Sequence, residues 1–223
     1  MPISLRGEKM ILDKERRFAF IHIPRTGGTS IRSVLGGDPN DASSSMLNND
    51  GIETSIIEQK FMSMSVNSYK WSHWSHMSVD IMEKQYWEQY NYIFTCVRNP
   101  WARLFSLYKK AFVGAPSCSF ESFVGTIYIN LHNNHTADFL HTTQDFWFSS
   151  PQGIQIDTVR FEDLSDENQW NHLMDKCGVK NKCRPHDNKS ESRQDYKAAY
   201  SRPSRYMVAV MESKTIDRFG YEF

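Results

Sequence analysis

The chain has 223 residues, of which 39% are hydrophobic and 13% aromatic. These values suit one folded domain with a full core and exclude a disordered chain. The 26 Lys and Arg residues are balanced by 26 Asp and Glu residues, so no overall positive charge attracts nucleic acid. Any site for an anion must therefore be built locally.

The sequence also gives expectations about membranes, compartment and metals. It contains no stretch of about 18 apolar residues, the length needed to span a bilayer. Residues 1–17 are charged throughout and lack the apolar centre of a signal peptide. No two of the four cysteines have the C-x-x-C spacing of a zinc site. We therefore expect a cytoplasmic protein with reduced thiols, no membrane span and no bound metal.

The first predicted elements are a strand, a helix and a loop. Residues 18–23 form a compact apolar run that ends at a loop containing Pro and Gly, which predicts a buried strand. A short helix is expected over residues 29–35, where Gly36 and Gly37 would end it. Residues 36–51 are rich in Gly, Asp, Asn and Ser, which predicts a mobile loop.

The middle of the chain predicts a strand followed by a helix. Residues 92–97 form the second apolar run and are expected to be a buried strand. The helix after it is expected to have Asn99 as its N-cap and Pro100 as its first residue. Its core face is predicted from four residues at helical spacing: Trp101, Leu104, Phe105 and Tyr108.

The last predicted elements are a strand and two helices. Residues 154–161 alternate apolar and polar side chains, as a third strand does. Helices are expected over residues 166–177 and 203–219. Strands that alternate with helices predict an α/β fold with a central parallel sheet flanked by helices on both faces. No internal repeat or second domain is evident, so residues 1–223 are expected to form a single domain.

The loop after the first predicted strand has the features of an anion site. Gly27 and Gly28 allow positive φ angles and a close approach of the backbone to a ligand. The amides at the start of the following helix point outward, with the positive end of the helix dipole behind them. Arg25 adds a positive charge to these amides, and Thr29 and Ser30 add two hydroxyl groups. The alternative is a tight strand-to-helix turn with a surface arginine. The Walker A pattern G-x-x-x-x-G-K-[ST] is absent.

The ten residues Ile21–Ser30, I-H-I-P-R-T-G-G-T-S, closely resemble a known binding loop. It is the 5′-phosphosulfate loop of carbohydrate-type sulfotransferases (family 2-like), I-H-I-P-K-T-G-G-T-S, which use the donor 3′-phosphoadenosine 5′-phosphosulfate (PAPS). The resemblance implies a P-loop-like sulfotransferase fold, and it implies donor contacts from Arg25, Thr26, Gly27, Gly28, Thr29 and Ser30. One departure is that the family has lysine at the position of Arg25.

A second segment, Val97–Tyr108, resembles the family's 3′-phosphate-binding pattern V-R-N-P-[WY]-x-R-L-x-S-x-Y. The resemblance implies that Arg98 and Ser106 hold the 3′-phosphate of the donor. A guanidinium at the end of a strand suits this role, because it makes bidentate contacts with phosphate. The alternatives are a surface salt bridge for Arg98 and a solvent-facing serine at 106.

Three further segments resemble the family downstream, at residues 159–164, 185–190 and 217–223. The second of them contains Lys189, which is either a further contact to a donor phosphate or a solvated lysine. Residues 36–70 match nothing in the family pattern, and this segment is a candidate for shaping the choice of acceptor.

Sulfuryl transfer also requires a base that activates the acceptor hydroxyl, and histidine titrates in the required range. His76 is the first candidate, because residues 76–81 resemble a family segment about twenty residues before V-R-N-P. His73 is the second candidate, and the alternative for each is a structural histidine. Arg25 is expected to stabilise the charge that develops on the leaving phosphate. Its high pKa prevents it from donating a proton.

The resemblance implies transfer of a sulfuryl group from PAPS to an acceptor hydroxyl, on a saccharide or glycoconjugate, with release of 3′-phosphoadenosine 5′-phosphate (PAP). Two alternatives stay open. One is a magnesium-dependent kinase of the same α/β superfamily. The other is a non-catalytic module that binds PAP or another phosphorylated ligand.

Overall fold

The computed structural model describes residues 11–35, 79, 83–111, 118–132, 143–180 and 196–223. The chain forms two compact units. The sheet unit consists of Met1–Val97 and Trp147–Pro185, and the helical unit consists of Arg98–Phe146 and His186–Phe223. The predicted mobile loop, residues 36–51, lies outside the described residues.

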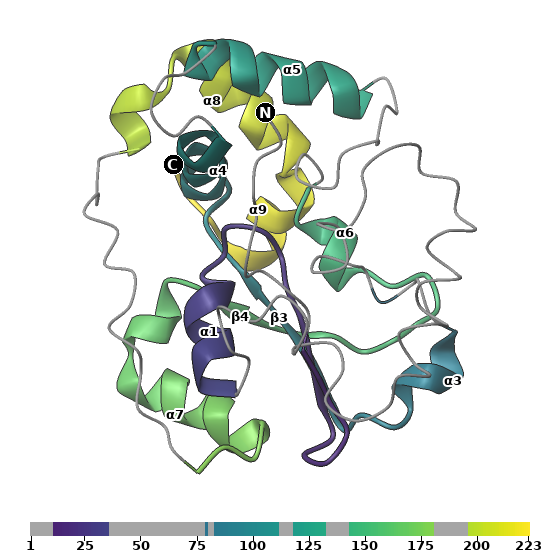
Figure 1. Ribbon diagram of the computed structural model, residues 1–223. Coiled ribbons are helices and arrows are strands. Elements are labelled where there is room, and N and C mark those ends of the chain that lie inside the picture. The colour runs from purple at the N-terminus through teal and green to yellow at the C-terminus, as the bar shows by residue number, and fades with distance from the viewer. Residues whose placement is uncertain (1–10, 36–78, 80–82, 112–117, 133–142, 181–195) are drawn as a thin grey trace. The chain divides into compact units, whose positions relative to one another are not determined.

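The sheet unit is built on a mixed sheet of four strands in the order β1-β2-β3-β4 (Figure 1). They are β1 (Ile11–Asp13), β2 (Phe18–Ile21), β3 (Tyr92–Val97) and β4 (Asp157–Arg160). β2, β3 and β4 are parallel, which confirms the three predicted strands and their arrangement. The edge strand β1, which no sequence pattern predicted, is antiparallel to β2. The sheet is therefore mixed rather than entirely parallel.

In the described part of the sheet unit, the helical elements that belong wholly to it are α1 (Gly28–Leu35), α3 (Lys84–Trp87), the 3₁₀ turn η4 (Asp163–Ser165) and α7 (Glu167–Lys176). The predicted helices over 29–35 and 166–177 are confirmed as α1 and α7. Asp166 is the N-cap of α7, and its side chain accepts hydrogen bonds from the backbone N–H groups of Asn168 and Gln169. This is the capping that Asp provides at a helix N-terminus.

The core of the sheet unit lies between one face of the sheet and helices α1 and α7. Side chains alternate along a strand, so every second residue of β2 and β3 faces these helices. Phe20 and Phe94 stack on this face with their ring centroids 4.9 Å apart. The cluster around them includes Phe18, Cys96, Ile31, Leu35, Trp170, Leu173 and Met174. Burying one large apolar side chain stabilises a fold by ~1.5–3 kcal/mol, so this core holds the strand ends and the start of α1 in place.

The helical unit contains α4 (Pro100–Ala111), α5 (Phe120–His132), the 3₁₀ turn η5 (Tyr196–Ala199), α8 (Arg202–Met211) and α9 (Ser213–Phe219). α4 begins as predicted, because Asn99 Oδ1 accepts a hydrogen bond from the N–H of Ala102 at 3.2 Å. The predicted core face of α4 is confirmed as well: two of its four residues are buried, and the other two pack against the same cluster. The short helix α6 (Asp145–Phe148) contains the point where the chain passes between the units.

The predicted helix over residues 203–219 is divided into α8 and α9. The break is at Glu212, whose φ of −103° and ψ of 21° depart from helical values. Its N–H still donates to the carbonyl of Val208, and its carbonyl accepts from the N–H of Ile216. The backbone thus changes direction without losing these two bonds. The Glu212 side chain at this break makes the buried contacts that are described below.

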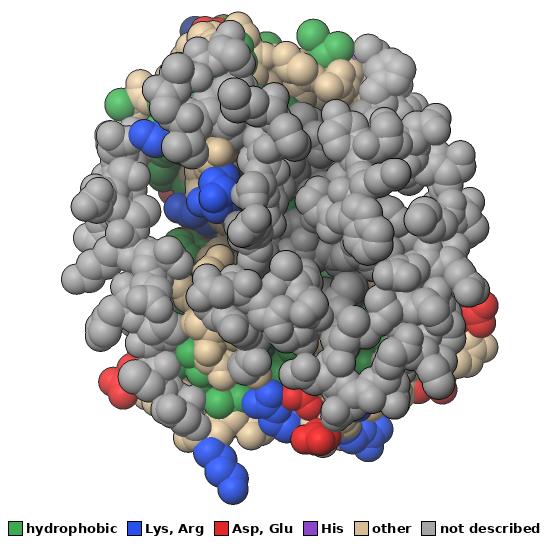
Figure 2. Space-filling model, viewed as in Figure 1, with side chains coloured by type: hydrophobic (Ala, Val, Ile, Leu, Met, Phe, Trp, Pro, Cys, Tyr) green, Lys and Arg blue, Asp and Glu red, His purple; other side chains and the backbone are tan. Residues whose placement is uncertain are grey.

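Among the described residues, no helix combines the length and apolar character needed to cross a membrane. On the face shown in Figure 2, the described Lys and Arg side chains form small groups, and some lie beside Asp and Glu side chains. This distribution agrees with the balanced charge of the sequence.

Candidate functional site

The candidate site of the sheet unit lies at the edge where the three parallel strands end. The register pairs Ile21 of β2 with Thr95, and Val97 of β3 with Arg160 of β4. One residue beyond β4, the N–H of Phe161 donates to the carbonyl of Val97 at 2.7 Å. The loop that joins β2 to α1 starts at this same edge. Open α/β sheets bind their ligands at the carboxyl ends of the strands.

Residues with positive and negative φ angles alternate along the backbone of this loop. Arg25 has a φ of 69° and Gly27 a φ of 84°, whereas Thr26 and Gly28 are not among the described residues with positive φ. Alternation of this kind turns successive N–H groups to one side and forms a concave anion site. The first backbone hydrogen bond of α1 is made by the N–H of Ser30, which donates to the carbonyl of Gly27 at 3.1 Å. The amides before it are the ones that a helix leaves for a ligand.

The two glycines of the loop are required by their neighbours. A Cβ at Gly28 would overlap the imidazole ring of His22, and one at Gly27 would overlap the ring of Phe161. His22 is 1% exposed, and it stacks on Phe20 with ring centroids 5.6 Å apart. His22 and Phe161 therefore form the wall against which the loop closes. No sequence pattern assigned this role to either of them.

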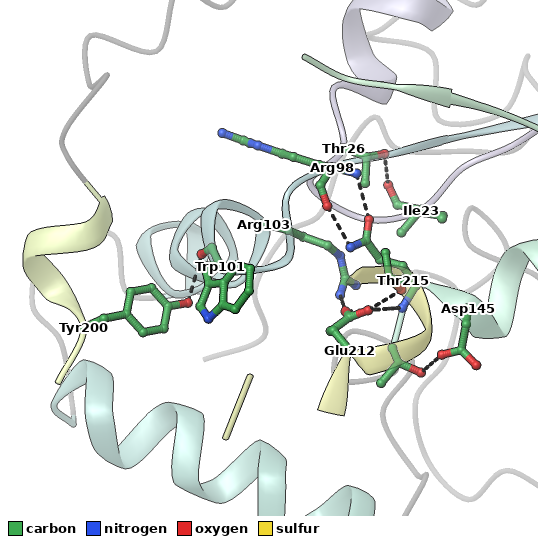
Figure 3. A network of polar contacts seen from close by, with 11 residues as sticks. Ile23, Thr26, Arg98, Trp101, Arg103, Asp145, Tyr200, Glu212 and Thr215 are labelled. Atoms are coloured by element: carbon green, nitrogen blue, oxygen red, sulfur yellow. Dashed lines mark hydrogen bonds and ion pairs between the residues drawn. The ribbon is translucent and has the colours of Figure 1, made fainter. Parts of the chain in front are cut away.

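Thr26 is predicted among the donor-binding residues, and the structure narrows what it can contribute. Its side chain is fully buried, and its hydroxyl donates to the carbonyl of Ile23 at 2.9 Å (Figure 3). Its own carbonyl accepts from the Cys96 thiol at 3.0 Å. With these groups engaged inside the protein, Thr26 has only its backbone amide to offer an anion. At the other predicted site positions of this loop, the side chains of Arg25, Thr29 and Ser30 are half-buried.

The candidate residues of the helical unit begin with Arg98, which is half-buried and directly follows the last residue of β3. Its backbone N–H donates to Gln144 Oε1 at 2.9 Å, and its carbonyl accepts from Gln144 Nε2 at 2.8 Å. In Figure 3 the Arg98 side chain extends away from these two contacts. Ser106 is half-buried on α4. Lys189, His73 and His76 lie outside the described residues.

Gln144 belongs to a buried polar network within the helical unit, of which Figure 3 labels Arg103, Glu212 and Thr215. Its backbone N–H donates to Glu212 Oε2 at 3.1 Å and Oε1 at 3.3 Å. Glu212 also accepts from Thr215 Oγ1 at 2.7 Å, and forms an ion pair with Arg103 Nη1 at 3.3 Å. Arg103 lies in the Val97–Tyr108 segment that resembles the family pattern, but nothing in that pattern predicted its ion pair with Glu212.

Burial sets the electrostatics of this pair. It raises the pKa of the Glu212 carboxyl, against the opposing effects of Arg103, Thr215 and the Gln144 amide. It also lowers the pKa of the Arg103 guanidinium, which Glu212 partly offsets. Each charge of the pair is thus tolerated inside the unit because the other is present.

Among the described residues, no three His, Cys, Asp or Glu side chains are grouped so as to hold a metal ion. In comparison with known proteins, a family model described as the sulfotransferase family matches residues 8–217. This match includes residues of the sheet unit and of the helical unit. No curated protein and no solved structure matches the chain.

Proposed function

Because the chain belongs to the sulfotransferase family, with a match over residues 8–217, we propose that it transfers a sulfuryl group from PAPS to a hydroxyl of a saccharide or glycoconjugate. The membership itself establishes a sulfotransferase enzyme that acts on a hydroxyl-bearing acceptor with a sulfonate donor. The identity of the donor as PAPS and the saccharide nature of the acceptor are the proposal.

The observation that carries this proposal is the backbone of residues 24–30. Alternating φ angles at Arg25 and Gly27 and the start of α1 at Gly28 produce a concave row of amides. Such a row binds an anion such as a phosphate or sulfate group. The contacts of Gly27 and Gly28 with aromatic rings leave no room for a side chain here, so the loop is shaped for close approach of the ligand to the backbone.

In the proposed reaction, the acceptor oxygen attacks sulfur, and the bond between sulfur and the oxygen of the 5′-phosphate breaks. The acceptor proton passes to a base, with His76 as the first candidate and His73 as the second. The bond electrons stay with PAP, whose 5′-phosphate gains charge as it leaves. The loop amides and Arg25 stabilise that charge. One well-aimed donor of this kind contributes ~2.7–4 kcal/mol to the transition state.

The same proposal assigns the 3′-phosphate of the donor to Arg98 and Ser106, with Lys189 as a further contact. A guanidinium offers paired N–H groups in a plane, which suits bidentate binding of phosphate. The assignment predicts selectivity for PAP over AMP, which has the same adenosine and 5′-phosphate but no 3′-phosphate.

The experiment is a measurement of PAP release from PAPS with a panel of saccharide acceptors, with and without a chelator. We expect acceptor-dependent release and tighter binding of PAP than of AMP. Turnover of ATP with magnesium instead would support a kinase. Binding of PAP without turnover on any acceptor would support a non-catalytic module.

The proposed base is tested in the same assay. A positioned base contributes ~10²–10⁴-fold to rate, so His76→Ala is expected to lose turnover by that order and keep its affinity for PAP. Near-normal turnover of His76→Ala would transfer the role to His73, which the matched variant His73→Ala tests.

A further inference from the structure

We infer that Gln144 is a positioning residue for binding of the donor's 3′-phosphate: it clamps the backbone of Arg98, and the buried Arg103–Glu212 pair holds Gln144 in place. The inference rests on the proposed function, since Arg98 is taken to bind that phosphate. It adds a residue from outside the two motifs to the donor site.

The clamp is a pair of hydrogen bonds between one side chain and one peptide unit on each side of Arg98. Gln144 Oε1 accepts from the Arg98 N–H at 2.9 Å, and Gln144 Nε2 donates to the Arg98 carbonyl at 2.8 Å. A carboxamide offers the donor and acceptor of a peptide group, and among side chains only those of Asn and Gln are carboxamides. Gln144 thus acts as a neighbouring strand would, at the residue where β3 has just ended.

Gln144 is itself held rigidly. It is fully buried, and its backbone N–H donates to the Glu212 carboxylate. This N–H is shared between the two carboxylate oxygens, at 3.1 Å from Oε2 and 3.3 Å from Oε1, and hydrogen bonds to a charged group are stronger than those between neutral groups. Glu212 is fixed in turn by Arg103 and by Thr215. A continuous row of buried contacts therefore runs from the α8–α9 junction to the backbone of Arg98.

The chain after Arg98 is fixed as well, because Asn99 caps α4 and donates through Nδ2 to the carbonyl of Glu222 at 2.8 Å. With its backbone held at these points, Arg98 keeps only the freedom of its own side-chain torsions. A group that is ordered before binding loses less entropy when it binds. The clamp therefore favours bidentate binding of a phosphate by Arg98.

The composition of the network favours positioning over stability as its purpose. A buried ion pair loses about as much by desolvation as it gains by attraction, and well-packed apolar residues often stabilise a fold equally well. What apolar residues cannot supply is a directional contact to both polar groups of the Arg98 backbone. The network supplies this contact through Gln144.

The test compares the affinities of the full chain for PAP and AMP by calorimetry. Gln144→Met removes both clamp bonds and keeps an unbranched side chain of similar length. We expect the ratio of PAP affinity to AMP affinity to fall about 10- to 100-fold, the order expected for losing a hydrogen bond to a charged group. Val124→Ala, a matched control at a fully buried position in α5, is expected to lower the melting temperature and keep the ratio.

A Gln144→Met protein that keeps the wild-type ratio would overturn the inference. If this variant does not fold, Thr215→Val replaces it, because it deletes one bond to Glu212 with little change in shape. A ratio that falls for Thr215→Val and not for Val124→Ala supports the inference, and an unchanged ratio overturns it. Failure of the proposed function has a different signature: the wild-type protein itself would bind PAP no better than AMP.

Discussion

The loop of the sheet unit and the Arg98 segment of the helical unit are two candidate anion-binding elements, and they are built differently. The loop closes against two aromatic rings that leave no room for side chains on its glycines. His22, close in sequence, lies against Gly28, and Phe161, one residue beyond β4, lies against Gly27. Arg98 is placed by Gln144, which lies 46 positions away in the sequence. Gln144 is held by Glu212, a further 68 positions away.

This difference explains why the two elements are not equally visible in the sequence. A site made from backbone amides needs particular residues at particular spacings, so it leaves a compact motif. A site made from one long side chain needs its supports, and supports can come from anywhere that the fold brings close. The substitutions below separate these two designs.

The largest effect on stability is expected from Arg103→Met. This substitution leaves the Glu212 carboxylate buried without its cation, and breaking a buried pair in this way costs about 3–5 kcal/mol in the free energy of unfolding. Chemical unfolding at several pH values measures the loss. Lys214→Met is the control, because Lys214 forms an exposed ion pair with Asp145 and its loss has a small effect.

The loss from Arg103→Met also has a predicted pH dependence. Burial already raises the pKa of Glu212 above its ordinary value, and removing Arg103 raises that pKa further. A raised pKa in the folded state means that the protonated form favours folding, so stability is greatest at low pH and falls as pH rises through the folded pKa. We therefore expect a larger loss at pH 8 than at pH 5. A loss independent of pH would contradict this account of the pair.

The next largest effect is expected from Gly28→Ala. Its Cβ would overlap the His22 ring, and overpacking of this kind costs about 1–3 kcal/mol. Because Gly28 belongs to the concave row of amides at residues 24–30, here called the cradle, PAP affinity is expected to fall together with the melting temperature. Calorimetry and thermal unfolding measure the two losses.

A double variant identifies the cause of the Gly28→Ala effect. Removing the ring with His22→Ala makes room for the new Cβ, so we expect Gly28→Ala to be less harmful in that background. Gly125→Ala is the matched control, since a Cβ there meets nothing within 4 Å. Equal effects of Gly28→Ala with and without His22 would show that the ring is not the obstacle.

These elements also show how far the fold could be predicted. The three parallel strands, α1, α4 and α7 were predictable, because apolar runs and helical spacing reflect burial directly. β1 has three residues, which is too short for any period to show. α5 is rich in β-branched and aromatic residues and has Gly125 in its interior, so local propensity argues against a helix. Burial of Phe120, Phe123, Val124 and Ile127 overrides that propensity.

The sequence predicted more of the candidate site in the sheet unit than in the helical unit. The loop and its glycines were recognised from their pattern. The pattern pointed to positive φ angles, which Gly27 has and Gly28 does not, but it gave no steric reason for glycine at 28. The structure supplies that reason in His22. Arg98 was recognised too, but Gln144 and Glu212 carry no motif of their own. Their roles follow from tertiary contacts alone, which spacing along the chain does not encode.

A smaller effect on stability is expected from replacing Arg25 by glycine, which relieves backbone strain at this position. Its φ of 69° is in the left-handed region, which costs a residue with a Cβ about 1–2 kcal/mol. Arg25→Gly is therefore expected to be more stable than Arg25→Ala by about 1 kcal/mol, although glycine usually destabilises. Chemical unfolding of the two variants measures this difference, and an alanine variant as stable as the glycine variant would contradict it.

The two Arg25 variants are also expected to lose turnover equally, because each removes the guanidinium. Arg25→Lys is the matched control, since it keeps a positive charge at the position where the family has lysine. We expect it to retain activity in the PAP-release assay. Loss of turnover in the glycine variant despite its better stability would separate the charge of Arg25 from its place in the fold.

The smallest effect is expected from Asp157→Asn, at the end of β4 away from the cradle. Asp157 accepts hydrogen bonds from Lys176 at 2.8 Å and from Tyr92 at 3.1 Å. Burial alone would raise the pKa of its carboxyl, but these bonds outweigh burial and hold the pKa below its ordinary value. A lowered pKa contributes stability at neutral pH that is lost as pH falls through the folded pKa.

The Asp157 and Lys176 side chains are 44% and 40% exposed, so solvent screening limits the contribution to about 0.2–1 kcal/mol. We expect Asp157→Asn to lose this amount at pH 7. The difference from the wild-type protein should shrink as pH falls below the ordinary carboxyl pKa and disappear below the lowered folded pKa. Because the register places Asp157 opposite Phe94, three residues before the end of β3, PAP affinity should not change. A fall in PAP affinity would show that the cradle depends on the whole sheet, rather than on the strand ends and the rings that enclose its glycines.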